Sequence, residues 1–144
     1  MSLNYQLVGY NWSPYHWENK QVSRWTQSNI NHVALRIGKY ETLVNQYGSQ
    51  WRKTSTLQRV YSMPLITTAK RTMSRAGLQA VTDVVANYGP MNRPYIYLYN
   101  FTGRFLPVPK SCTDLTWHCL RALGVDLKER FLPNTLLKEF YTCK

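Results

Sequence analysis

The 144-residue sequence lacks any run of about eighteen apolar residues, which excludes a transmembrane α-helix. It also lacks the charged and then apolar N-terminal pattern of a signal peptide, so we expect a cytoplasmic protein. No internal repeat, low-complexity tract or linker interrupts the chain. We therefore expect a single domain over residues 1–144, and its small size and basic composition would suit a phage-encoded protein.

Acidic residues are scarce. Seven Asp and Glu stand against eighteen Lys and Arg, which gives a formal net charge of +11. No acidic residue occurs between Glu41 and Asp83, whereas six basic residues do: Arg52, Lys53, Arg59, Lys70, Arg71 and Arg75. This pattern predicts contact with a polyanion such as nucleic acid, anionic lipid or a cell-wall polymer. A generally basic, solvated surface is the alternative.

Cysteine is rare as well. The three cysteines, Cys112, Cys119 and Cys143, are odd in number and lie seven and twenty-four residues apart. This spacing fits neither a disulfide framework nor the clustered ligands of a zinc site. We therefore expect no metal and no other cofactor.

The segment 110–124 is typical of a helix with a cysteine in its first turn. Ser111 is a good N-cap, Asp114 completes a capping-box pattern, and Gly124 favours a C-terminal stop. An apolar stripe at helical spacing begins at Cys112 and continues through Leu115, Cys119, Ala122 and Leu123. Cys112 should therefore face inward, where unpaired N–H groups and the helix dipole lower a thiol's pKa. This is a favourable place for a nucleophile, and the alternative is a buried cysteine that fills space.

Residues 31–47 predict a β-hairpin with a two-residue turn at Gly38-Lys39. The register set by this turn pairs Ile37 with Tyr40, Arg36 with Glu41, Leu35 with Thr42, Ala34 with Leu43, Val33 with Val44, and His32 with Asn45. Arg36 and Glu41 then form a favourable cross-strand charge pair. His32 and Asn45 become neighbours on one face of the hairpin.

The remaining elements complete an α+β fold, in which a small antiparallel sheet packs against the cysteine helix. We expect helices over about 14–25 and 71–88, strands over about 57–66 and 95–99, and a short terminal helix capped by Thr135.

These elements place three residue types that a cysteine hydrolase needs. Cys112 would be the nucleophile, His32 the general base, and Asn45 the group that orients the imidazole, with Glu41 as the alternative if the turn is longer. The backbone N–H of Cys112 would stabilise the oxyanion. Two other histidines compete. His118 lies about 240° around the helix from Cys112 and should be a surface or interface residue, and His16 has no evident orienting partner.

The segments 111–115 and 32–38 resemble the cysteine and histidine motifs of NlpC-type papain-like hydrolases. Because His32 precedes Cys112, the resemblance is to the circularly permuted branch, which includes lecithin:retinol acyltransferase-like proteins. It implies a papain-like fold in which Cys112, His32 and Asn45 form the catalytic site. The implied reaction is cleavage of an amide in a peptide or peptidoglycan stem through an acyl-enzyme.

Two other functions are kept as alternatives. One is acyl transfer or hydrolysis of a lipid or acyl ester, in which the basic surface would meet an anionic membrane. The other is nucleic-acid binding without catalysis, through the acid-free stretch 42–82 and its tyrosines. The oligomeric state does not follow from the sequence.

Overall fold

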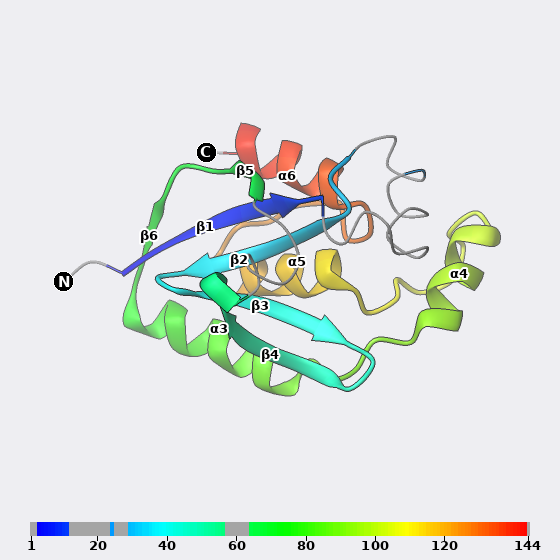
Figure 1. The fold of residues 1–144 in the computed structure, drawn as a ribbon, viewed down its shortest axis with the longest axis horizontal. Coiled ribbons are helices and arrows are strands. Elements are labelled where there is room, and N and C mark those ends of the chain that lie inside the picture. The colour runs from blue at the N-terminus through cyan, green and yellow to red at the C-terminus, as the bar shows by residue number, and fades with distance from the viewer. Residues whose placement is uncertain (1–2, 12–23, 25–28, 57–63, 144) are drawn as a thin grey trace.

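A six-stranded sheet forms the centre of the protein (Figure 1). The computed structural model describes residues 3–11, 24, 29–56 and 64–143. The strands are β1 (Leu3–Tyr10), β2 (His32–Ile37), β3 (Tyr40–Asn45), β4 (Gly48–Lys53), β5 (Pro64–Thr67) and β6 (Arg71–Met73). Their order is β4-β3-β2-β1-β5, β6 also pairs with β1, and every pairing is antiparallel.

Helices α3 (Arg75–Asn87), α5 (Cys112–Ala122) and α6 (Pro133–Thr142) cover one face of this sheet (Figure 1). Helix α4 (Arg93–Phe101) lies at one end of the molecule, away from the strands. The fold is therefore α+β, as the sequence predicts. Within the described ranges, no helix combines the length and apolar character needed to cross a bilayer.

The two faces of the sheet follow from the alternation of side chains along each strand. On β1 and β2, Leu7, Val33 and Leu35 point toward the helices and join the main core. The neighbouring side chains on the other face form a second buried cluster: Val8, Tyr10 and Ala34. His32 has the same parity as Ala34, so it belongs to this second face.

The hairpin turn and its first two pairs are confirmed. Arg36 pairs with Glu41 and Ile37 with Tyr40, but the β2–β3 ladder contains only these two pairs. At the next rung the backbone N–H of Leu35 donates to the Thr42 hydroxyl (3.1 Å) rather than to the Thr42 carbonyl that a regular two-residue hairpin would use. The strands diverge from this point, and α5 packs behind both of them (Figure 1).

Two predictions about the middle of the chain need correction. Residues 95–99 lie within α4 and not in a strand. Asn92 caps this helix by accepting from the backbone N–H of Tyr95 (3.1 Å), and Pro94 lies in its first turn. These start signals outweigh the β propensity of the tyrosines. The helix expected over 71–88 is shorter, because residues 71–73 form β6 and Ser74 caps α3.

The other expected elements have mixed outcomes. The terminal helix is present as α6, but it begins at Pro133 and has no side-chain cap, so Thr135 lies inside it. The strand expected over 57–66 overlaps β5 only at its end, and most of that range lies outside the described residues. The expected helix over 14–25 and His16 also lie outside them, except for residue 24.

Candidate functional site

Helix α5 begins at Cys112, as predicted. The Ser111 side chain accepts a hydrogen bond from the backbone N–H of Asp114 (3.2 Å), which caps the helix. Cys112 is half-buried, packs against the main core, and occupies the first helical position. The first turn of α5 therefore presents its free N–H groups around a cysteine sulfur.

The Cys112 sulfur lies beside β2, on the side where β3 has diverged. The backbone N–H of Val33 lies near enough to this sulfur to lower the pKa of the thiol. The Thr113 hydroxyl lies 3.9 Å away, and the backbone N–H groups of Cys112 and Thr113 also lower the pKa of this thiol. Odd-numbered residues of β2 direct their N–H groups toward β3, as Leu35 does, so the sulfur lies on the β3 side of β2. It therefore lies next to the peptide bond that joins His32 to Val33.

Burial raises the pKa of the Cys112 thiol, and the surrounding N–H and hydroxyl donors lower it by a smaller amount. The expectation that the helix N-terminus would lower this pKa is therefore wrong in its net direction. Desolvation disfavours the thiolate more than the donors stabilise it. In the resting protein Cys112 is a neutral thiol at neutral pH.

His32 is the first residue of β2 and pairs with Tyr10 of β1. The two rings lie 5.7 Å apart between centroids. The His32 side chain is buried, and this burial lowers the pKa of the imidazole from 6.5 to about 3. His32 is therefore neutral at neutral pH, which is the form that can accept a proton.

The face of the sheet that carries the His32 side chain also carries a network of polar side chains. The Tyr10 hydroxyl donates to both carboxylate oxygens of Glu41 (2.6 and 2.7 Å). Arg36 forms an ion pair with the same carboxylate (3.1 Å), as the sequence predicts. Glu41 is fully buried, so both partners are needed to offset the desolvation of its charge. Burial and this carboxylate raise the pKa of Tyr10, which stays protonated.

The sequence predicts that Asn45 lies beside His32 because it assumes a regular β2–β3 ladder. The observed ladder does not extend to these two residues. Asn45 ends β3, where its Oδ1 accepts from the backbone N–H of Tyr47 (2.8 Å) in the β3–β4 turn. Its carbonyl accepts from the backbone N–H of Met91 (2.8 Å). The start of β2 and the end of β3 lie apart in Figure 1. Tyr10, which the sequence analysis did not single out, packs its ring beside that of His32.

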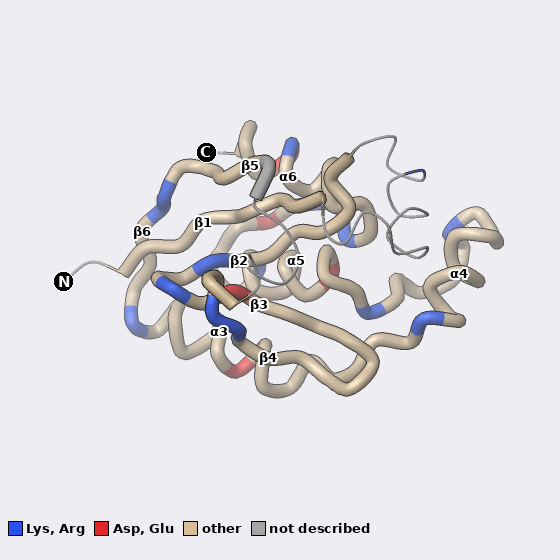
Figure 2. The backbone as a smooth tube through the Cα atoms, in the orientation of Figure 1, with Lys and Arg blue, Asp and Glu red and all other residues tan. Residues whose placement is uncertain are grey.

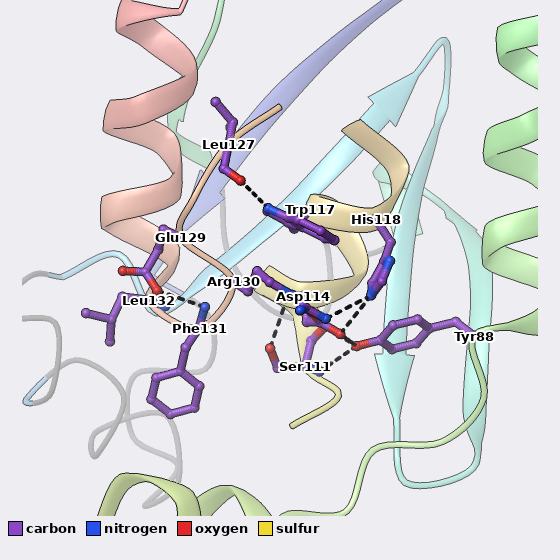
Figure 3. A network of polar contacts seen from close by, with 10 residues as sticks. All are labelled: Tyr88, Ser111, Asp114, Trp117, His118, Leu127, Glu129, Arg130, Phe131 and Leu132. Carbon is purple, nitrogen blue, oxygen red and sulfur yellow. Dashed lines mark hydrogen bonds and ion pairs between the residues drawn. The ribbon is translucent and has the colours of Figure 1, made fainter. Parts of the chain in front are cut away.

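A second polar network fixes the start of α5 (Figure 3). The Tyr88 hydroxyl accepts from the backbone N–H of Ser111 (3.0 Å) and donates to the Asp114 carboxylate (2.6 Å). Arg130 Nε donates to the other Asp114 oxygen (2.8 Å). Because Asp114 is buried, these donors hold its charge and tie the cysteine-bearing turn to the end of α3 and to the loop before α6.

His118 belongs to this second network and is only partly exposed. Its Nε2 lies 3.5 Å from Asp114 and 3.2 Å from Arg130, and its ring packs edge-on against Trp117. Burial lowers the pKa of His118, while Asp114 opposes this shift. His118 was expected to be a surface or interface residue, and its side chain is 38% exposed within this network. The sequence could have indicated this contact, because residues four apart on a helix, such as Asp114 and His118, lie next to each other.

The other two cysteines occupy different environments. Cys119 is fully buried, and burial raises its pKa to about 12, which makes it unreactive. Cys143 is half-buried at the C-terminal end of α6. Among the residues that the structure describes, no group of three His, Cys, Asp or Glu side chains is arranged to hold a metal ion.

Comparison of the chain with protein-family models, curated proteins and solved structures gave no match.

Proposed function

We propose that the protein is a cysteine-dependent hydrolase in which Cys112 attacks a carbonyl carbon and His32 acts as general base. The observation that carries the proposal is the position of the Cys112 sulfur. It lies at the capped start of α5, beside the peptide that joins His32 to Val33. The proposal pairs this thiol with the neutral imidazole of His32, because acyl transfer through cysteine requires a base of this type.

The protonation states are those of a neutral pair and not of a resting thiolate–imidazolium ion pair. The Cys112 pKa is raised and the His32 pKa is lowered, so both side chains are neutral before substrate binds. The sulfur would lose its proton to His32 as the bond to the substrate carbonyl forms. The backbone N–H groups of Val33, Cys112 and Thr113, which favour the thiolate, would stabilise negative charge that develops on the sulfur.

The complete reaction has two halves. In the first, the thiol adds to the carbonyl, and the tetrahedral oxyanion collapses with transfer of the His32 proton to the departing amine. This leaves a thioester on Cys112. In the second half, His32 takes a proton from water, the resulting hydroxide attacks the thioester, and the acid product leaves with the thiol restored.

Tyr10 and Glu41 are the residues we assign to the positioning of His32. The Tyr10 ring packs beside the imidazole, and the Tyr10 hydroxyl is fixed by both oxygens of Glu41. Glu41 is the alternative to Asn45 for orienting the imidazole, and it would act on His32 indirectly, through Tyr10. Asn45 would contribute to the β3–β4 turn rather than to the imidazole.

The substrate class rests on the resemblance to NlpC-type hydrolases, which implies an amide in a peptide or a peptidoglycan stem. The net charge of +11 would favour an anionic substrate or polymer. Figure 2 shows Lys and Arg gathered where β2, β3 and β4 lie together. Arg36 belongs to β2, Lys39 to the turn after it, and Arg52 and Lys53 to β4.

Cleavage of peptides and purified peptidoglycan by the whole protein tests this function, with products identified by mass spectrometry. We expect cleavage by the wild type and by Cys143→Ala, none by Cys112→Ala, and a rate at least roughly a hundredfold lower for His32→Gln. Cleavage that survives in Cys112→Ala would overturn the proposal. So would the absence of cleavage when folded wild-type protein is offered peptides, peptidoglycan and acyl esters.

A further inference from the structure

The end of α4 and the turn after it carry large apolar side chains in an exposed position. Phe101 and Phe105 are 89% and 91% exposed, and Leu98 and Leu106 are also exposed. We call these four residues the apolar projection: Leu98, Phe101, Phe105 and Leu106. Figure 1 shows that α4 forms one end of the molecule, apart from the layer of sheet and helices. Exposed aromatic side chains gathered in this way mark an interaction surface.

The apolar projection is held in place by its own contacts. Tyr99, on the opposite side of α4, is buried and packs edge-on against Phe131 (4.9 Å between ring centroids). The backbone N–H of Arg104 donates to the Tyr99 carbonyl (3.0 Å), and the Tyr95 hydroxyl donates to the Pro107 carbonyl. These contacts fix the helix and both ends of the turn. The phenylalanines are therefore presented to solvent by an ordered support.

The charged residues in the segment that carries the apolar projection are all basic. Arg104 and Lys110 are exposed in the same segment, and Arg93 lies at the start of α4. No acidic residue occurs in the sequence between Asp83 and Asp114. Figure 2 accordingly shows Lys and Arg, and no Asp or Glu, on α4 and its flanks. A partner of this surface must accept aromatic rings and carry negative charge.

We propose that the apolar projection docks on the surface of an anionic lipid bilayer. Phenylalanine and leucine side chains on a convex, projecting element can enter the boundary between headgroups and acyl chains, while adjacent Arg and Lys contact lipid phosphates. Tyr95 and Tyr97 on the same helix are residues enriched at the membrane–water boundary. A protein partner would have to supply a deep acidic groove to match the same features. None of these four apolar residues belongs to the proposed catalytic site, so this proposal does not depend on the proposed catalysis.

Co-sedimentation of the whole protein with vesicles tests the proposal. One set of vesicles contains phosphatidylcholine alone and the other a mixture of phosphatidylcholine and phosphatidylglycerol. We expect binding to the mixed vesicles that weakens with salt, and much weaker binding to the neutral vesicles. The double variant Phe101→Ser with Phe105→Ser should bind the mixed vesicles roughly tenfold or more weakly. Cys112→Ala should bind as the wild type does, which separates docking from catalysis.

The matched control replaces two exposed tyrosines elsewhere, Tyr47→Ser with Tyr141→Ser, which are 85% and 80% exposed. This variant should keep wild-type binding. The proposal is wrong if the wild type does not bind mixed vesicles at low salt, or if the phenylalanine variant binds them as well as the control does. It is also wrong if the phenylalanine substitutions abolish binding to single-stranded DNA, or self-association, while vesicle binding is unchanged.

Discussion

Acid should destabilise the protein through His32, because the folded chain holds this imidazole neutral. Burial lowers the His32 pKa from 6.5 to about 3. In the unfolded chain the same side chain takes up a proton below about pH 6.5. A group whose pKa is lower in the folded state contributes its full stability above the unfolded pKa. That stability is then lost as the pH falls from 6.5 toward 3.

The size of the effect follows from these two pKa values. Each pH unit between them changes the free energy of unfolding by about 1.4 kcal/mol. His32 alone should therefore remove about 1.4 kcal/mol at about pH 5.5 and about 2.7 kcal/mol at about pH 4.5. Solvent screening does not reduce this figure, because the side chain is only 7% exposed.

Urea denaturation of the wild type and of His32→Gln, at about pH 7.5 and about pH 4.5, measures the effect. The other titrating groups are common to both proteins, so only the change in the stability difference between them matters. We expect that difference to move by about 2.5 kcal/mol in favour of the variant at the lower pH. Equal differences at the two pH values would refute the buried, neutral imidazole. If the Gln variant does not fold, His32→Asn serves for the same comparison.

Two substitutions test the packing around the site. Tyr88→Phe removes the hydroxyl that joins Ser111 and Asp114, so we expect urea denaturation to show a free energy of unfolding lower by about 2–3 kcal/mol. The control variant Tyr141→Phe should be as stable as the wild type. A loss below about 0.5 kcal/mol in Tyr88→Phe would contradict the network. Gly9→Ala would put a Cβ 2.6 Å from a terminal methyl of Leu137. Thermal unfolding should therefore show a free energy of unfolding lower by about 1–3 kcal/mol. An unchanged melting temperature would contradict this close packing.

The start of the cysteine helix could be predicted because capping is local. Ser111, Cys112 and Asp114 lie within four residues, and the hydrogen bond that caps the helix needs no distant partner. The turn at Gly38-Lys39 could be predicted for the same reason. The same local signals were available for α4, where Asn92 and Pro94 mark a helix start that β propensity obscured.

The surroundings of the thiol could not be predicted from local pattern. The β2–β3 ladder ends after two pairs, the Thr42 hydroxyl takes the N–H of Leu35, and Cys112 lies beside Val33 past this point. Burial at this position reverses the expected direction of the Cys112 pKa.

The packing of Tyr10 beside His32 could not be predicted from local sequence pattern either. Tyr10 meets His32 only through the pairing of β1 with β2, across twenty-two residues of sequence. Interactions between distant strands decide these features, and short motifs carry no information about them.

The most direct test of the account is the site of acylation. The protein is mixed with p-nitrophenyl acetate, quenched in acid, and analysed by peptide mass mapping. We predict an acetyl group on Cys112, much slower acetylation there in His32→Gln, and unchanged acetylation of Cys112 in Cys143→Ala. Acetylation that falls on other residues while Cys112 stays unmodified, or that proceeds at Cys112 as fast without His32, would contradict the claim that these two residues form a catalytic pair.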